Sequence, residues 1–219
     1  MKRSWAEEKE SGRHETTGFE EFYTRIVPAA IDPTDEPIAV CGLGCGTGLE
    51  LVGVFARAPR AQVDVVALSA KMLERLRASH RERAAQIRAV RGSHLTGALP
   101  DGAYDYILAV NTIHHLLPSR RAGLYRRIRR ALKPGGKYIE ADWFVDSASE
   151  ATYRQSLEER AAAMGVAAEE VAGVYHIDVP ASVETAVSLM RESGFSEVDV
   201  EWRECENAVI VAQVCADAP

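Results

Sequence analysis

Residues 38–51, IAVCGLGCGTGLEL, have the residue types and the spacing of a ligand site made from backbone. A short apolar run leads into Gly42, Gly44, Gly46 and Gly48, and the residues after them begin a helical pattern. Glycine has no Cβ, so the main chain can approach a ligand closely, and the free N–H groups at a helix start attract electron-rich atoms. The stretch therefore predicts a strand, a ligand-binding turn and a helix.

Side chains that could act on a substrate follow two later strand-like runs. His114 and His115 come just after the run that ends at Asn111, and Asp142 and Trp143 end the next such run. A histidine at such a place can remove a proton from an acceptor or contact a cofactor. We therefore name His114, His115 and Asp142 as catalytic candidates. The alternatives are that one histidine caps a backbone group while the other lines the pocket, and that Asp142 caps a loop.

Aromatic and polar residues elsewhere are candidates for substrate binding. They are Phe19, Tyr23, Trp143, Tyr175 and His176. Aromatic side chains near the N-terminus can fold over a pocket, exclude water and shape an apolar site. They can also pack on a sheet or form a dimer contact, and the segment around Tyr175 also suits the start of a helix.

No metal site is expected from the spacing of ligand residues. None of the four cysteines forms a CxxC pair. A site from His114, His115, His176 and Asp178 is conceivable, but it matches no recognised spacing.

The composition argues against two classes of partner. The net charge is −6 over 219 residues, which argues against a partner that is nucleic acid or a membrane surface. The arginine cluster from Arg120 to Lys133 is read as a solvated helix face. With no apolar leader and no long apolar run, we expect a cytoplasmic protein with reduced thiols, which can form a homodimer.

The element pattern predicts an α/β protein. Apolar strand-like runs alternate with helical patterns, and this order predicts a doubly wound, mostly parallel sheet with helices on both faces. Expected strands are 38–43, 62–68, 87–91, 104–111, 137–142, 197–204 and 208–214. Residues 1–36 are expected to form an N-terminal arm and helix that act as a lid. Residues 37–219 are expected to form the main domain, with a helical insert at about 146–182.

The motifs resemble those of class I S-adenosylmethionine-dependent methyltransferases of the small-molecule type. Gly44-Cys45-Gly46-Thr47-Gly48 matches the end of motif I, D-x-G-C-G-T-G. Further similar segments, in the same order, are 68–73, 104–107, 113–116, 132–136 and 194–195. The resemblance implies a Rossmann-like seven-stranded sheet with an antiparallel C-terminal edge strand. It also implies methyl transfer from S-adenosylmethionine to an O, N or C atom of a small molecule.

The same resemblance implies a set of cofactor-binding positions. They are Gly42, Gly44, Cys45, Gly46, Gly48, Ala67, Leu68, Met72, Ser93, His94 and Asn111. At three of these the family places acids, and this chain has Gly42, Ala67 and Ser93 instead. Asp64 lies three residues before Ala67, about 10 Å away on a strand and on the opposite face, so we do not expect it to substitute.

Two alternatives follow from those missing acids. In one, the protein has a methyltransferase-like fold with a degenerate cofactor site and acts as a partner subunit, a ligand-binding module or another enzyme. In the other, Asp64 serves a nicotinamide-dinucleotide enzyme. The glycine spacing disfavours the second, since Leu49 or Thr47 stands where G-x-G-x-x-G needs its last glycine.

Overall fold

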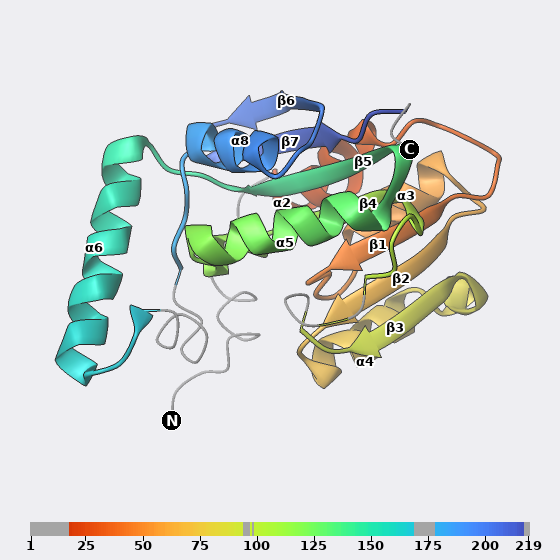
Figure 1. Ribbon diagram of the computed structural model, residues 1–219. Helices are drawn as coiled ribbons and strands as arrows, with labels where there is room; N and C mark the ends of the chain where they lie inside the picture. Colours follow the sequence, from red (N-terminus) through yellow and green to blue (C-terminus); the bar gives the residue numbers. More distant parts are fainter. Residues whose placement is uncertain (1–17, 94–96, 98, 169–177, 217–219) are drawn as a thin grey trace.

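The centre of the protein is a seven-stranded sheet in the order β3-β2-β1-β4-β5-β7-β6 (Figure 1). The computed structural model describes residues 18–93, 97, 99–168 and 178–216. The strands are β1 Ala39–Leu43, β2 Gln62–Ala67, β3 Ile87–Arg91, β4 Tyr104–Val110, β5 Leu132–Trp143, β6 Glu197–Glu204 and β7 Asn207–Gln213. Neighbours among β1 to β5 are parallel, and β7 is antiparallel to β5 and β6. This arrangement confirms the predicted doubly wound α/β fold. The antiparallel strand β7 lies one place in from the edge, which β6 forms.

Helices cover both faces of this sheet (Figure 1). They are α2 Phe19–Glu21, η1 Phe22–Ile26, η2 Val27–Ala30, α3 Glu50–Arg57, α4 Ala70–Ser79, η3 Arg81–Gln86, η4 Ile113–His115, α5 Pro118–Ala131, α6 Ser147–Met164 and α8 Val183–Glu192. The N-terminal segment, α3 and α4 pack with alternate strand residues such as Val40 and Leu108 in one core. The helices α5 and α8 pack in a second core with the other set, such as Cys41 and Ile107. The alternation of strand side chains thus creates two apolar layers.

The N-terminal helical segment, residues 19–30, is part of the first core. It was expected to be one helix, and it consists of a turn of α-helix, a π-helix and a 3-10 helix. Gly53 of α3 permits its close approach, because a Cβ at that position would lie 2.8 Å from the Pro28 Cβ. The ring of Phe22 packs 5.5 Å from that of Trp202 in β6. These residues therefore close one face of the sheet.

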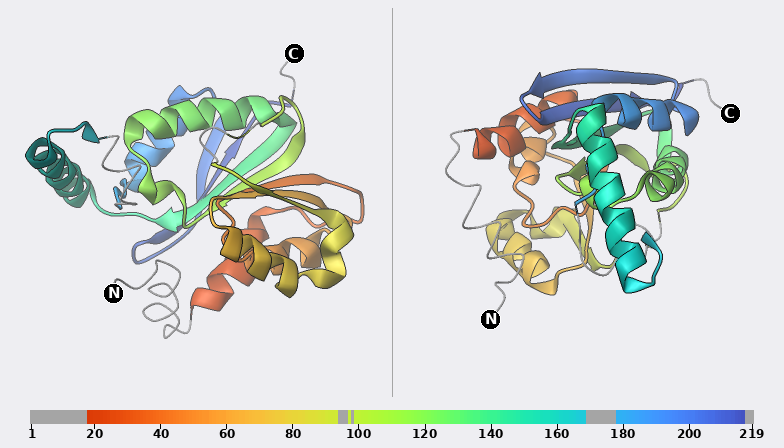
Figure 2. Two further views of the ribbon diagram at one scale, coloured as in Figure 1. Left: turned by 90° about the horizontal axis from the view of Figure 1, so that it is seen from below. Right: turned by 90° about the vertical axis from the view of Figure 1, so that its left-hand side faces the viewer.

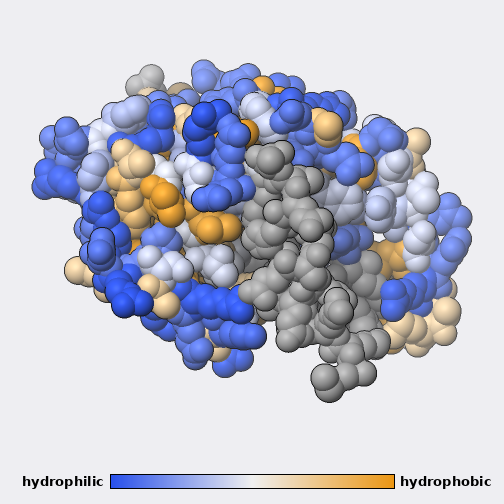
Figure 3. Space-filling view, turned by 180° about the vertical axis from the view of Figure 1, so that it is seen from behind, coloured by the Kyte–Doolittle hydropathy of each residue, from blue (hydrophilic) through white to orange (hydrophobic). Residues whose placement is uncertain are grey.

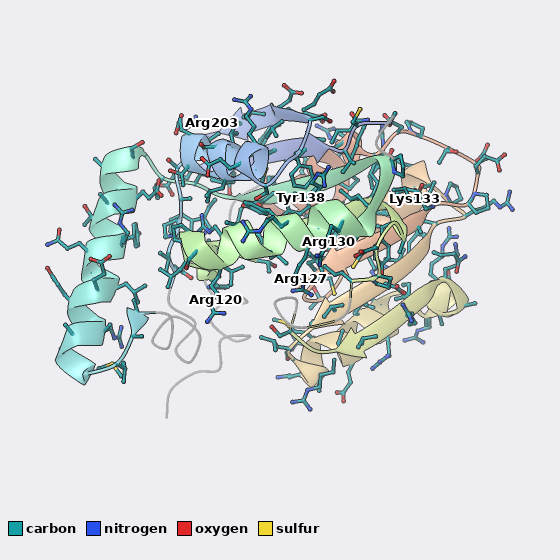
Figure 4. The ribbon with its side chains drawn as sticks, in the orientation of Figure 1. Arg120, Arg127, Arg130, Lys133, Tyr138 and Arg203 are labelled. Atoms are coloured by element: carbon teal, nitrogen blue, oxygen red, sulfur yellow. The ribbon has the colours of Figure 1, made fainter. Side chains whose placement is uncertain are left out.

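The arginine-rich helix α5 has one buried arginine among exposed ones. Arg120 and Arg130 are exposed, as the predicted solvated face requires, and Figure 4 shows them along the helix. Arg121 is only 2% exposed. Directly after α5, strand β5 begins at Leu132, five residues earlier than expected, because Leu132 pairs with Tyr104 before an irregularity in the register.

The helical insert begins with α6, which follows the carboxyl end of β5 and extends beyond the sheet (Figures 1 and 2). Asp146 caps its first turn by accepting from the N–H groups of Ala148 and Ser149. Leu157 and Ala161 are its buried residues, and they form a third apolar cluster with Leu117. This cluster joins α6 to the loop after β4.

The helices of the described residues fall short of a bilayer-spanning helix in length or in hydropathy. Within the residues that the structure describes, no helix combines the length and the apolar character that a bilayer crossing needs. On the face seen in Figure 3, hydrophilic residues predominate outside the grey region.

Candidate functional site

The glycine-rich turn crosses the carboxyl ends of β1 and β4. Gly44, Gly46 and Gly48 all have positive φ, at 66°, 55° and 74°. At Gly44 glycine is obligatory for a second reason, since a Cβ there would lie 2.5 Å from Oγ1 of Thr112. At Gly46 the space is open, and the nearest atom to an added Cβ is Sδ of Met72 at 4.0 Å. The turn is thus packed on one side and open on the other.

The open side of the turn presents unused backbone donors. The N–H groups of Gly44 and Gly48 bond to the carbonyls of Val66 and Cys45. Among the described residues, those of Gly46 and Thr47 donate to no acceptor. Two such donors beside an open face suit the electron-rich atoms of a ligand.

A buried acid, Glu50, lies behind this turn in the first turn of α3. It is 2% exposed, and burial raises its pKa to about 7, opposed by its own backbone N–H. Its charge also contributes, after burial, to raising the pKa of the Cys45 thiol. The sequence reasoning did not identify Glu50.

The end of β2 and the start of α4 lie next to the glycine-rich turn at the carboxyl edge of the sheet. Ser69 caps α4 by accepting from the N–H of Met72. Ala67 is buried and Leu68 is 51% exposed, and both side chains are apolar, so neither offers a polar side-chain group there.

Asp64 is engaged elsewhere and does not replace the missing acid. Its carboxylate accepts from Arg88 Nε at 2.7 Å and from the Tyr104 hydroxyl at 2.8 Å. The hydrogen bond from Arg88 lowers the pKa of Asp64, although partial burial opposes this. The expectation that Asp64 does not serve a nucleotide site fits this geometry.

The loop after β4 is tied to the glycine turn and to the N-terminal segment. Asn111 has a positive φ of 47°, and its Nδ2 donates to the Tyr23 hydroxyl at 2.6 Å. Thr112 Oγ1 donates to the carbonyl of Gly44 at 3.2 Å. Tyr23 is buried and Thr112 is 5% exposed, so these contacts are shielded from water.

Asp142 is a buried carboxylate that organises the histidine loop. Its Oδ2 accepts from the N–H groups of Thr112, Ile113 and His114 at 3.3, 2.9 and 3.1 Å. Its Oδ1 lies 2.6 Å from Nδ1 of His114 and accepts from the N–H of Trp143 at 2.9 Å. Burial would raise the pKa of Asp142, but the charge and hydrogen bonds of His114 outweigh it and lower that pKa. Asp142 therefore caps the loop before η4 and fixes the ring of His114.

The second nitrogen of His114 faces another carboxylate. Its Nε2 lies 3.6 Å from Oδ1 of Asp178, and Nδ1 of His115 lies 3.0 Å from the same oxygen. The rings of His114 and His115 are 4.0 Å apart between centroids. Three potential ligand atoms thus converge within 4.8 Å of one another.

Arg121 binds the backbone on both sides of this cluster of histidines and Asp178. Its Nε donates to the carbonyl of Leu116 at 2.8 Å, and its Nη2 donates to the carbonyl of Val179. The N–H of Val179 in turn donates to the carbonyl of His114 at 2.6 Å. The buried guanidinium therefore joins the histidine loop to the segment that carries Asp178.

Trp143 contributes an aromatic wall next to the histidines. Its ring lies 5.8 Å from that of His114 and 6.0 Å from that of Tyr153 in α6. His94, Tyr175 and His176, predicted as site residues, lie outside the described residues, as does the side chain of Phe19.

A hollow of about 550 Å³ lies away from these groups. Its lining includes Phe55, Ala56, Ser79 and His80, from the carboxyl ends of α3 and α4. Both helices start at the carboxyl edge of the sheet and run back toward the amino ends of the strands. In open α/β sheets ligands bind at the carboxyl edge, so we assign the site to that edge and not to the hollow.

Three functional residues escaped the sequence reasoning for separate reasons. Thr112 and Glu50 belong to no motif, and their place in the site follows only from the contacts of Thr112 with Gly44 and of Glu50 with the surroundings of Cys45. Arg121 was hidden among surface arginines, although its spacing from Leu124, Tyr125 and Ile128 on α5 places it on the buried face of the helix.

Comparison with known proteins identifies the fold of this site. Residues 40–136 match the family model described as a methyltransferase domain. Among curated proteins no sequence matches the chain significantly.

Solved structures with the same fold include methyltransferases. A candidate O-methyltransferase from Nostoc punctiforme is 22% identical with a TM-score of 0.64, and the match covers 86% of this chain and 55% of that one. Human N-acetylserotonin methyltransferase in complex with S-adenosylmethionine is 19% identical with a TM-score of 0.63, covering 90% and 53%. The chain thus spans about half the length of these two proteins.

A third structure matches over nearly its whole length. It is the complex between the Trm112 methyltransferase activator and a candidate methyltransferase from Haloferax volcanii, 14% identical with a TM-score of 0.67, covering 98% and 99%. Together with the strand order, these matches establish the class I methyltransferase fold.

Proposed function

We propose that the protein binds S-adenosylmethionine at the turn Gly44–Gly48 and transfers its methyl group to an O, N or C atom of a small molecule. The observation that carries this proposal is the open glycine turn, with its unused N–H groups, beside the loop of His114. The bound cofactor supplies an activated methyl group on a sulfonium centre. The family model over residues 40–136 supports the same reaction class.

The residues present fit the methionine end of such a cofactor. The open cradle at Gly46 leaves room that a Cβ would fill. The N–H groups of Gly46 and Thr47 can donate to a carboxylate. The carboxyl group of Glu50, close to Cys45, is available to an ammonium group. We therefore assign these residues and the Asn111–Tyr23 pair to cofactor binding.

The part of the site expected to bind the ribose of the cofactor has fewer hydrogen-bonding side chains. Ala67 stands at the end of β2, where the family has an acid, and it offers no acceptor. A charge-assisted hydrogen bond contributes on the order of 1.5–3 kcal/mol, so its loss weakens binding by about one to two decades. We therefore expect weak, but measurable, cofactor binding.

On the acceptor side, His114 and Asp142 act as a pair. Asp142 holds Nδ1 of His114 and thereby leaves Nε2 to face the acceptor or another ligand. An acceptor proton can move to Nε2 as the new bond to the methyl carbon forms, with the bond from that carbon to sulfur breaking. Trp143 limits the space beside this nitrogen and so orients a small acceptor.

Calorimetric titration with S-adenosylmethionine and its demethylated product tests the proposal. We expect a dissociation constant in the micromolar range, and Ala67→Asp should tighten it by at least about tenfold. Ala151→Asp, at an exposed position of α6, is the matched control and should leave affinity unchanged.

One observation favours a second function. Gly42 and Ala67 both lack a carboxylate, which also suits a methyltransferase-like protein whose pocket takes another ligand or serves a partner subunit. The absence of any binding at millimolar cofactor, together with tight binding by the Ala67→Asp variant, would support that function and refute ours.

A further inference from the structure

We propose that His114, His115 and Asp178 form a binding site for one divalent transition-metal ion. The site is built from side chains that the sequence spacing gave no reason to combine, because Asp178 is 63 residues beyond His115. The fold brings them together at the carboxyl edge of the sheet. The inference does not rest on cofactor binding at the glycine turn. It shares Nε2 of His114 with the proposed transfer, and an ion bound to that nitrogen excludes its use as the proton acceptor.

Two of the three distances between the ligand atoms match those around a metal ion. Metal bonds of about 2.0–2.2 Å at angles between octahedral and tetrahedral values place neighbouring ligand atoms roughly 2.9–3.6 Å apart. The distances from Asp178 Oδ1 to His115 Nδ1 and to His114 Nε2 are 3.0 and 3.6 Å. The three ligand atoms lie within 4.8 Å of one another, so a small side-chain rotation brings the two histidine nitrogens to the distance found around a metal ion.

A buried carboxylate orients the first of these ligands. Metal-binding histidines commonly donate their other ring N–H to a carboxylate, which fixes the tautomer and makes the free nitrogen more basic. Asp142 Oδ1 lies 2.6 Å from Nδ1 of His114, and the side chains of His114 and Asp142 are 3% and 2% exposed. This contact directs Nε2 of His114 toward Asp178.

Backbone contacts fix the segment that carries the carboxylate ligand. The N–H of Val179 donates to the carbonyl of His114 at 2.6 Å, next to Asp178 in the chain. Arg121 donates to the carbonyl of Val179 from a fully buried position. The histidines and the carboxylate therefore belong to one hydrogen-bonded unit, so little ordering is needed on binding.

The ligand set indicates the kind of ion. Two imidazole nitrogens and one carboxylate oxygen suit Zn²⁺ or Fe²⁺, whereas Mg²⁺ and Ca²⁺ prefer oxygen ligands alone. Three protein ligands leave coordination positions for water or for an oxygen of an acceptor. The Asp178 side chain is 39% exposed, which provides access for the ion.

An ion-paired cluster without a metal is the competing explanation. In that case a histidine is protonated and Asp178 only neutralises it. The two explanations differ in stoichiometric metal uptake and in which substitutions affect it.

The test is titration of the tag-free full-length protein, stripped with a chelator, with Zn²⁺ by calorimetry and with Co²⁺ by visible absorption. We expect one equivalent per chain, with d–d bands of Co²⁺ that report nitrogen and oxygen ligands. His115→Gln and Asp178→Asn should each weaken binding by at least about tenfold. Asp199→Asn, at an exposed position of β6, is the matched control and should bind like the wild type.

Each outcome decides the inference. Uptake of less than 0.2 equivalents, on the order expected for adventitious metal alone, would overturn it. So would equal affinity in the wild type and in both ligand variants, because the ion would then be bound elsewhere. Metal uptake by a protein that fails to bind S-adenosylmethionine would refute the proposed function and leave the metal site standing. Circular dichroism of each variant establishes that it is folded.

Discussion

Replacement of Asp142 by asparagine is the sharpest test of how the site is built. The carboxylate accepts from three successive backbone N–H groups, from the ring of His114 and from the N–H of Trp143. Asparagine has the same shape, but it carries no charge and one of its two ends is an NH₂ donor. That donor would face N–H groups and leave several of them without an acceptor in a buried place.

The magnitude follows from this loss. Removal of one partner from a buried, hydrogen-bonded charge pair costs about 3–5 kcal/mol. For a chain of this length, that corresponds to a decrease of the melting temperature by roughly 6–20 °C. Asp142→Asn should therefore lower the free energy of unfolding by this amount in urea, whereas Asp199→Asn should change it by less than about 0.5 kcal/mol.

The result that refutes this reasoning is a loss below about 1 kcal/mol with an unchanged denaturant slope. The capping role of Asp142 would then be wrong, and the loop after β4 would have to be held by the remaining contacts, chiefly those of Thr112 and Arg121. Amide hydrogen exchange at residues 112–114 gives an independent readout, since these N–H groups should lose protection first.

Two further predictions concern the glycine turn and its buried acid. Gly44→Ala should lower the free energy of unfolding in urea by about 2–5 kcal/mol, because alanine is strained at positive φ and its Cβ would overlap Thr112. Gly102→Ala, with φ 61° and open space around it, has only the first of these effects and should cost about 1–2 kcal/mol. Equal losses in the two variants would exclude the overlap with Thr112 as a cause. The raised pKa of Glu50, about 7 when folded, means that the folded state holds its proton over a range where the unfolded state has lost it, so its contribution to stability falls as pH rises from 4.5 to 7. In denaturation experiments between pH 4.5 and 8, Glu50→Gln should reduce the fall in the free energy of unfolding by about 3 kcal/mol. The exposed control Glu158→Gln should leave that fall unchanged. An unchanged pH dependence in Glu50→Gln would show that Glu50 is already ionised in the folded protein.

The fold was predictable because its signals are local and periodic. Apolar runs predicted the strands near their observed bounds, except that β5 begins five residues earlier than expected. The N-terminal segment was harder, because its helical spacing is real but its π and 3-10 geometry follows from close packing on Gly53. Packing partners distant in the chain leave no trace in a local pattern.

The site was predictable only in part for the same reason. The glycines and the histidines follow strands in the sequence, so their edge of the sheet could be inferred before the structure. The roles of Thr112, Arg121 and Asp178 depend on contacts between segments separated by up to 68 residues. Asp142 shows the limit most clearly. The sequence allowed a cap of the loop that follows Asp142, whereas the structure shows Asp142 capping the earlier loop, residues 112–114, which holds His114.

Under the proposed function, these contacts separate the strength of cofactor binding from the geometry of methyl transfer. One chain of hydrogen bonds runs from the carbonyl of Gly44 through Thr112 to Asp142, and from Asp142 to His114. The turn and the acceptor-side groups are thereby held in one buried unit. Ala67, where the family has an acid, lies outside that chain of hydrogen bonds, at the end of β2. A contact made equally in the ground state and the transition state changes KM and leaves kcat alone. Under the proposed function, we therefore expect the missing carboxylate to weaken cofactor binding and to leave the position of His114 unchanged.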